Sequence, residues 1–255
     1  MPWNPEQYHK FRAQRAAPFE DLVKLIRVRP GMRAIDLGCG TGELTARLAD
    51  LLPDSDVLGL DSSAEMLGRA EAFVRPGLRF EQGTIESVAG EWDLIFSHAA
   101  LQWVDDHQTL ISRLFGLLKP GGQLVVQMPS NHTHYSHQVV RELAAQEPFA
   151  TALGGWSRSA PVLPIDAYAE LLFACGGEDI TVFEKIYPHI LPDADAIAEW
   201  TSGTLLVPYM ERLPSALHAA FMDAYRTRLR ARWPQGPVFY GFRRTLFAAI
   251  APQGE

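Results

Sequence analysis

Three closely spaced glycines, preceded by an acidic residue, form the stretch of the sequence best suited to binding a small ligand. Asp36 is followed by Gly38, Gly40 and Gly42, after an apolar run and before a helix predicted over residues 43–52. Glycine lets the backbone turn sharply and approach a ligand without a clashing Cβ. A helix that begins at such a turn presents unpaired N–H groups to the ligand. The pattern predicts a loop that holds a nucleoside cofactor; the alternative is a glycine-rich turn without a ligand.

The spacing of these glycines separates two classes of cofactor. A nicotinamide dinucleotide site has a third glycine three residues after the second, whereas Glu43 occupies that position here. Asp36 would repel a pyrophosphate, but it would suit a ligand with a sulfonium and an α-ammonium group. Asp61, at the end of the next predicted strand, can accept hydrogen bonds from ribose hydroxyls in either case. The loop therefore favours a sulfonium cofactor.

Alternating strands and helices must position this loop. Apolar runs predict strands over residues 33–37, 57–60, 78–81, 93–96 and 123–128, with helical patterns between them. This alternation predicts an α/β fold with a doubly wound, mostly parallel sheet and helices on both faces. Two more strand candidates, over residues 180–187 and 244–250, would add antiparallel strands at the sheet edge and bring the total to seven.

The chain reads as a single domain over residues 1–255, because no linker or low-complexity tract divides it. We expect an N-terminal helical cap over residues 1–29 and a cofactor-binding core over residues 30–130. Helical patterns over residues 131–178 and 190–235 would form the substrate cap, the second of them inserted before the last strand.

Composition narrows the range of partners. The formal net charge is −7 and apolar residues make up 47% of the chain. An acidic balance argues against nucleic acid as the main partner, and no apolar run is long enough to predict a membrane span. Cys39 and Cys175 are the only cysteines, which fits a reducing cytoplasm. No feature fixes the oligomeric state, and we favour a monomer.

Metal and hydrolase chemistry find little support. His132, His134 and His137 follow the fifth strand without a nearby cysteine or acidic ligand, so we expect no metal site. The serines lack the context of a nucleophile elbow. For His137, hydrogen bonding to substrate is the functional alternative, and a polar loop is the structural one.

The chain resembles class I S-adenosylmethionine-dependent methyltransferases, which share a Rossmann-like fold. The resemblance rests on four motifs: Asp-Leu-Gly-Cys-Gly-Thr-Gly, Leu-Asp-Ser-Ser, Ala-Leu-Gln-Trp and Leu-Lys-Pro-Gly-Gly, between residues 36 and 122. A narrower resemblance, to the trans-aconitate methyltransferases, spans nearly the whole chain. Its signals are the Trp-Asn-Pro start at Trp3, Leu-Gln-Trp at residues 101–103, and Gln-Met-Pro at residues 127–129.

This resemblance implies roles for individual residues. Asp36 and the three glycines would hold the methionine end of S-adenosyl-L-methionine, and Asp61 would hold its ribose. Ser97 would lie beneath the sulfonium, together with His98. Trp103 would wall the methyl-transfer pocket. The remaining cofactor contacts would come from Trp3, Tyr8, Ser62, Met66, Thr84 and Ile85.

Two departures from the family pattern concern the adenine and the acceptor. Thr84 stands where the superfamily often has an acidic residue for the adenine amino group, so backbone groups of Thr84 and Ile85 would have to make that contact. Val207 stands where the narrower family tends to have arginine. A tricarboxylate needs cationic partners, and Arg158, Arg243 and Arg244 are the candidate substitutes.

The expected reaction is methyl transfer to a carboxylate of trans-aconitate or a related acid, which yields a monomethyl ester and S-adenosyl-L-homocysteine. A carboxylate is already ionised at neutral pH, so we expect no indispensable acid or base. His98, His137, Arg158, Arg244 and Trp103 are candidates for positioning the substrate. The alternatives are methylation of a malonyl thioester, transfer to another small molecule, and a non-catalytic cofactor-binding module.

Overall fold

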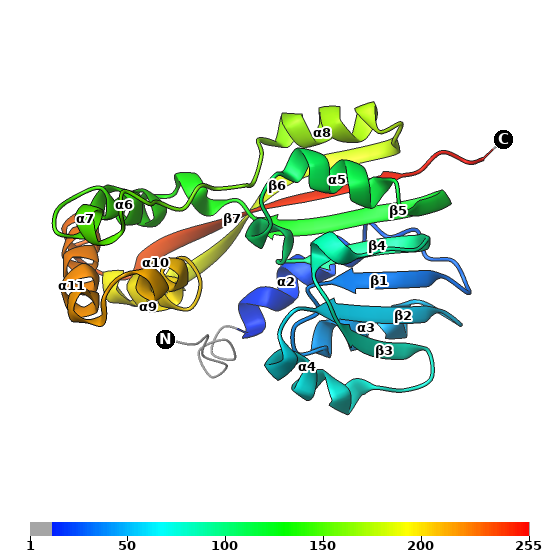
Figure 1. The fold of residues 1–255 in the computed structure, drawn as a ribbon, viewed down its shortest axis with the longest axis horizontal. Helices are drawn as coiled ribbons and strands as arrows, with labels where there is room; N and C mark the ends of the chain where they lie inside the picture. The colour runs from blue at the N-terminus through cyan, green and yellow to red at the C-terminus, as the bar shows by residue number, and fades with distance from the viewer. Residues whose placement is uncertain (1–11, 255) are drawn as a thin grey trace. The chain divides into compact units, whose positions relative to one another are not determined.

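The computed structural model describes residues 12–254, and their side chains from residue 17 onward. Within them, one sheet holds seven strands in the order β3-β2-β1-β4-β5-β7-β6 (Figure 1). Neighbouring strands from β3 to β5 pair in parallel, and β7 pairs antiparallel with β5. The predicted doubly wound, mostly parallel sheet is confirmed. The strands are β1 (Arg33–Leu37), β2 (Asp56–Asp61), β3 (Leu78–Gln82), β4 (Trp92–His98), β5 (Leu118–Pro129), β6 (Glu178–Leu191) and β7 (Val238–Ile250).

The described residues form two compact units, which we call the sheet unit and the helical unit. The sheet unit contains residues 17–129, 161–185 and 244–254, and the helical unit contains the described residues 12–16 with residues 130–160 and 186–243, so the first turn of α2 is assigned to the helical unit and the rest of it to the sheet unit. The helices of the sheet unit are α2 (Arg12–Val23), α3 (Glu43–Leu51), α4 (Ala64–Ala70), α5 (His107–Phe115) and α8 (Ile165–Ala174). Those of the helical unit are α6 (Tyr135–Ala144), α7 (Phe149–Ala152), α9 (Ala194–Ser202), α10 (Val207–Arg212) and α11 (Ser215–Arg232).

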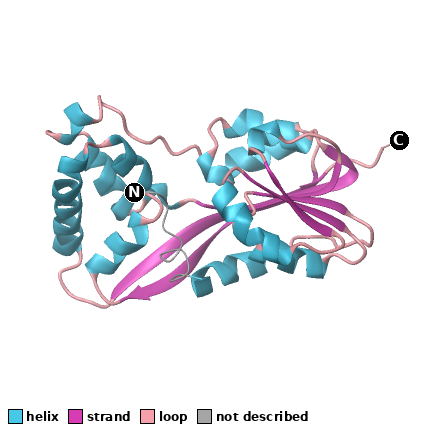
Figure 2. Ribbon diagram, turned by 60° about the horizontal axis from the view of Figure 1, so that its bottom comes forward, coloured by secondary structure: helices cyan, strands magenta, loops and turns pink. Residues whose placement is uncertain are grey.

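Each face of the sheet is covered by helices, as Figure 2 shows. Alternate residues of a strand point to opposite faces. Ile35 and Leu37 therefore pack with Leu110 of α5 and Leu172 of α8. Ala34 and Phe96 face the other way and pack with Phe19 of α2 and Leu48 of α3. We call this second side the α2 face.

Helix α8 lies in the sheet unit, although the sequence predicts it as part of a cap segment over residues 131–178. Its Tyr168 is fully buried, stacks on Phe247 with ring centroids 4.9 Å apart, and contacts His107 of α5. Burial of this aromatic side chain against β7 explains why the helix joins the sheet. The predicted segment 131–178 therefore contributes to both units.

The core of the helical unit comes from α6, α9, α10, α11 and the first half of β7. Buried side chains such as Val139, Ile197, Phe221 and Tyr240 form one apolar cluster. Thr201 and Tyr225 share a hydrogen bond of 3.1 Å inside it. Apolar packing with such bonds accounts for a separate core.

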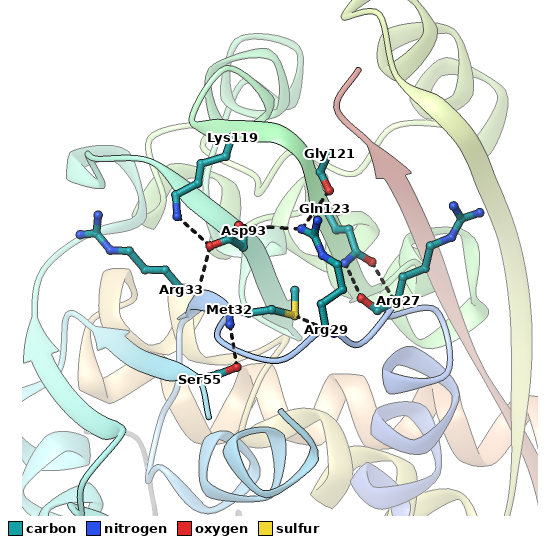
Figure 3. Close-up of polar contacts among 9 residues, drawn as sticks. All are labelled: Arg27, Arg29, Met32, Arg33, Ser55, Asp93, Lys119, Gly121 and Gln123. Carbon is teal, nitrogen blue, oxygen red and sulfur yellow. Dashed lines mark hydrogen bonds and ion pairs between the residues drawn. The ribbon is translucent and has the colours of Figure 1, made fainter. Parts of the chain in front are cut away.

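At the amino ends of the parallel strands, a group of polar contacts fixes the segment between α2 and β1 (Figure 3). The Gln123 amide of β5 accepts from the backbone N–H of Arg27 at 2.7 Å and donates to the carbonyl of Arg27 at 2.8 Å. Asp93 of β4 bonds to Lys119 at 2.8 Å and to the backbone N–H of Arg33 at 2.9 Å. These contacts fix the amino edge of the sheet, opposite the edge at which the glycine loop follows β1.

None of the helices within residues 12–254 has the length and apolarity to cross a lipid bilayer.

Candidate functional site

The glycine loop joins the carboxyl end of β1 to the start of α3. Gly38, Gly40 and Gly42 have φ values of 76°, 55° and 78°, which lie in the left-handed region that favours glycine. A Cβ at Gly38 would lie 2.2 Å from the Cβ of Ala100. The loop is therefore both left-handed and tightly packed against the segment that follows β4.

Asp61, at the end of β2, ties this loop to the neighbouring strand. Its two carboxylate oxygens accept from the backbone N–H of Gly40 at 2.8 Å and from that of Ser63 at 2.9 Å. Each carboxylate oxygen has a second lone pair. Asp61 thus organises the loop and retains the acceptor capacity that ribose hydroxyls would use.

Asp36 is a buried carboxyl group at the start of the loop. Its side chain is 3% exposed; Oδ2 accepts from Thr45 Oγ1 at 2.6 Å, and Oδ1 has no hydrogen-bond partner among the described residues. Burial raises the pKa of Asp36 to about 7, with the Thr45 hydrogen bond opposing and the charge of Asp61 adding to the shift. A buried carboxylate oxygen without a donor fits a cationic ligand group such as an ammonium.

The segment predicted to border the adenosine has several groups already engaged. Ser63, rather than Ser62, caps α4 by accepting from the backbone N–H of Met66 at 3.3 Å. The N–H of Thr84 donates to Ser87 at 3.2 Å, and the carbonyl of Ile85 accepts from Arg113 at 2.6 Å. These local bonds compete with the adenine contact expected from the backbone of Thr84 and Ile85.

The carboxyl end of β4 approaches the glycine loop. The Ser97 hydroxyl is buried and donates to the carbonyl of Leu37 at 2.9 Å, so it joins β4 to β1. The His98 ring lies edge-on to Phe19, with centroids 6.0 Å apart. Ala99 has a φ of 58°, which is strained for a residue with a Cβ. Such strain marks a turn that the surrounding structure holds in place.

Trp103 lies in a short 3-10 turn over Leu101–Trp103, beyond the end of β4. Its side chain is 49% exposed, which is unusual for a large aromatic residue. His107 Nε2 lies 3.0 Å from the carbonyl of Leu101, and its Nδ1 contacts the hydroxyl of Tyr168. These buried contacts fix the turn that carries Trp103.

Arg244 of β7 is 5% exposed, and its Nη1 lies 3.3 Å from Oε1 of Gln127 on β5. Gln127 is absent from the set of site residues predicted from sequence, although a lone amide within the apolar run of residues 124–128 is a signal. The partner of Asp36, Thr45, is also absent from that set; its signal is a hydroxyl in the first turn of α3.

His137 and Arg158 lie in the helical unit. Burial lowers the pKa of His137 to about 3, with further lowering from the nearby His134 and Arg141. Its Nδ1 lies 3.3 Å from the Ser136 hydroxyl. The backbone N–H of Arg158 donates to the hydroxyl of Tyr209 at 3.2 Å. His137 is therefore a neutral side chain at physiological pH.

The loop histidines have structural contacts. His134 caps α6 by accepting from the backbone N–H of Ser136 at 3.2 Å, and the carbonyl of His132 accepts from Arg141 at 2.9 Å. In residues 12–254 no cluster of three or more histidine, cysteine or acidic side chains has the arrangement of a metal site. Val207, at the position of the missing arginine, begins α10.

Most of the predicted site residues lie in the sheet unit: Asp36, Gly38, Gly40, Gly42, Asp61, Ser62, Met66, Thr84, Ile85, Ser97, His98, Trp103 and Arg244. His137 and Arg158 belong to the helical unit. Trp3 and Tyr8 lie outside the described residues.

Comparison with known proteins gives full-length relatives. Residues 29–163 match the family described as "Methyltransferase domain". A curated protein from Deinococcus radiodurans, named trans-aconitate 2-methyltransferase, is 51% identical over 99% of this chain and 100% of its own length. Another of that name, from Variovorax paradoxus, is 39% identical over 92% of this chain and 91% of its own length.

A solved structure shares the fold at lower identity. The YcgJ protein from Bacillus subtilis superposes with a TM-score of 0.62 at 15% identity, covering 94% of this chain and 100% of that chain. At this identity the likeness supports the fold alone.

Proposed function

Because this chain belongs to the methyltransferase domain family, and within it to the family of the full-length trans-aconitate 2-methyltransferases, we propose that it transfers a methyl group from S-adenosyl-L-methionine to a carboxylate of trans-aconitate or a closely related acid. The observation that carries this proposal is the similarity over the whole chain. The fold by itself would not select an acceptor, because one fold hosts many chemistries.

The residues of the glycine loop suit this cofactor. Asp36 offers a buried acceptor to the α-ammonium group, and Asp61 offers acceptors to the ribose. The left-handed glycines let the backbone come close to the methionine end. Ser62, Met66, Thr84 and Ile85 remain candidates for the adenine side, and Ser97 supports the loop through its bond to Leu37. When bound, the cofactor supplies an electrophilic methyl group on a sulfonium, and S-adenosyl-L-homocysteine is the product.

The protein's part in the reaction is to orient the acceptor and exclude water. A carboxylate attacks as the ionised form that dominates at neutral pH, so no side chain has to remove a proton. The lowered pKa keeps His137 neutral, which suits a hydrogen-bonding role better than a charge-pairing one. We therefore assign no indispensable acid or base to His98 or His137.

Acceptor binding requires cationic groups, because trans-aconitate carries three carboxylates. We assign this role to the buried Arg244 of the sheet unit, and Arg158 of the helical unit is the second candidate to replace the family arginine at Val207. Trp103 and His98 would wall the acceptor on the cofactor side. We further infer a single-domain enzyme with a helical cap, which acts as a monomer in the cytoplasm, where thiols such as those of Cys39 and Cys175 stay reduced.

The test is methylation of an acid panel by the purified full-length protein with labelled cofactor. The panel contains trans-aconitate, cis-aconitate, citrate and a malonyl thioester, and mass spectrometry identifies the products. We expect a monomethyl ester of trans-aconitate, with the highest kcat/KM of the panel. Turnover of the malonyl thioester alone would replace the proposed acceptor, and cofactor binding without any turnover would contradict an enzyme.

A further inference from the structure

Two buried polar side chains lie side by side on β5 and β7, near the carboxyl edge of the sheet. Gln127 is 0% exposed, and Arg244 is almost as deeply buried. Gln127 pairs with Leu246, and Arg244 pairs with Pro129, in the antiparallel register of the two strands. Side chains that are opposite each other, or two residues apart, share a face. Both polar side chains therefore lie on the α2 face, to which Leu246 contributes.

The contact between them fixes the orientation of the glutamine amide. An arginine guanidinium can only donate hydrogen bonds, so the atom of Gln127 that faces Arg244 must be the amide oxygen, at 3.3 Å from Nη1. The amide nitrogen then points elsewhere. This Nε2 is buried and has no hydrogen-bond partner among the described residues. A buried amide donor without a hydrogen-bond acceptor is unfavourable. The position of Gln127 Nε2 is therefore explained best by a ligand that accepts a hydrogen bond from it.

The strand register relates this donor to the cofactor loop. Gln127 pairs with His98 of β4, and Phe96 of β4 pairs with Asp36 of β1. All four therefore share the α2 face. Strands β1 and β5 flank β4, so Asp36 and Gln127 are on the order of 10 Å apart. Asp36 Oδ1 on β1 is a hydrogen-bond acceptor, and Gln127 Nε2 on β5 is a hydrogen-bond donor, and neither has a partner among the described residues. This arrangement suits a cationic cofactor near β1 and an anionic methyl acceptor near β5, with His98 of β4 between them.

We propose that Gln127 donates a hydrogen bond to a carboxylate of the acceptor, and that Arg244 holds the amide in the orientation that makes this possible. This inference rests on the proposed function, which supplies an acceptor with several carboxylates. Gln127 binds a carboxylate that is not methylated, because a hydrogen bond to the attacking oxygen would reduce its nucleophilicity. It is thus a specificity-determining residue for polycarboxylates, and it acts on binding more than on the chemical step.

The experiment compares KM and kcat for trans-aconitate in the variants Gln127→Met and Gln127→Glu at saturating cofactor. Methionine keeps the length of the side chain and removes the donor. We expect KM to rise about tenfold with kcat within about twofold of the wild-type value. Glutamate keeps the contact with Arg244 but presents a negative charge to the acceptor, so we expect a larger rise in KM. The cofactor Kd, measured by calorimetry, stays unchanged in both variants.

Gln123→Met is the matched control. Gln123 lies on the same strand, but both of its amide atoms are bonded to the backbone of Arg27 at the opposite edge of the sheet. We expect this variant to unfold at a lower temperature and to keep the wild-type KM. A general weakening of β5 would instead raise KM in both variants.

The outcomes separate the inference from the function on which it rests. Wild-type turnover of trans-aconitate with KM unchanged in Gln127→Met overturns the role of Gln127 alone. An equal rise in KM and in the cofactor Kd also overturns it, because the residue would then support the loop rather than the acceptor. A wild-type enzyme that neither binds nor methylates trans-aconitate overturns the proposed function and this inference together.

Discussion

At the scale of the single residue, the buried carboxylate of Asp36 is expected to bind the ammonium group of the cofactor and so to determine cofactor affinity. Its Oδ1 lacks a donor and its Oδ2 is held by Thr45. We expect Asp36→Asn to raise the cofactor Kd at least tenfold, because the amide cannot neutralise an ammonium group. Hydrogen bonds between charged groups contribute about 1.5–3 kcal/mol each, which agrees with that size. Calorimetry of cofactor binding measures the change.

Thr45→Val is the companion variant for Asp36. It removes the hydroxyl that orients the carboxylate but leaves the charge in place, so the cofactor Kd should rise less than in Asp36→Asn. Equal affinities for wild type and Asp36→Asn would show that the buried carboxylate serves the loop and not the ligand.

Individual residues differ in how well their surroundings can be predicted from sequence. The glycine spacing and Asp36 predict a ligand loop because these residue types have few other uses in that pattern. The bond from Gly40 to Asp61 and the one between Arg244 and Gln127 depend on strand register. Register joins residues that are 21 and 117 positions apart in the chain, and local patterns carry no information on it.

At the scale of the element, two alanine substitutions separate the effect of backbone strain in the glycine loop from the effect of steric contact with Ala100. Gly38→Ala adds a Cβ in a left-handed conformation and places it 2.2 Å from Ala100. Gly31 has a similar φ of 72° with nothing within 4 Å of an added Cβ. We expect Gly31→Ala to cost about 1 kcal/mol of unfolding free energy. Gly38→Ala should cost about 1–3 kcal/mol more, as overpacking does.

Denaturant unfolding of both glycine variants measures this difference, and cofactor binding provides the second measurement. Gly31→Ala should bind cofactor like the wild type, whereas Gly38→Ala should lose affinity. If the two variants lost the same stability, the contact with Ala100 would not constrain the loop.

The elements themselves could be predicted in part. The first five strands follow from apolar runs between helical patterns. Strand β7 begins at Val238, six residues before the predicted start, because Val238, Tyr240 and Phe242 alternate as buried residues across Gly241. The place of α8 in the sheet unit could not be predicted, since it depends on the packing of Tyr168 on Phe247 of β7, a contact between residues far apart in the chain.

At the scale of the whole molecule, the buried side chains of Asp36 and His137 make the free energy of unfolding depend on pH in opposite directions. The pKa of Asp36 is raised to about 7, so the folded protein holds a proton that the unfolded chain loses above pH 4. Stability from this group therefore falls as the pH rises from 4 to 7. The pKa of His137 is lowered to about 3, so its contribution is lost as the pH falls below 6.5. Between pH 4 and 6.5 the contributions of Asp36 and His137 to the pH dependence of the unfolding free energy therefore cancel.

In the cofactor-free protein, Asp36→Asn removes the contribution of Asp36 to the pH dependence of stability and leaves that of His137. Its unfolding free energy should then rise with pH between 4 and 6.5, by about 1.4 kcal/mol per pH unit relative to wild type. His137→Gln should show the opposite trend. Thermal unfolding of the cofactor-free proteins across this range provides the measurement, and parallel curves for wild type and Asp36→Asn would contradict the raised pKa of Asp36.

Cys39, within the glycine loop, has a consequence for the enzyme's lifetime. Its thiol is buried and its pKa is raised, chiefly by burial and also by the charges of Asp36 and Asp61. The thiolate is the nucleophilic form of cysteine. Burial, helped by the charges of Asp36 and Asp61, therefore keeps the Cys39 thiol protonated at neutral pH. We expect this cysteine to react slowly with alkylating agents, although it lies in the loop assigned to an alkylating cofactor.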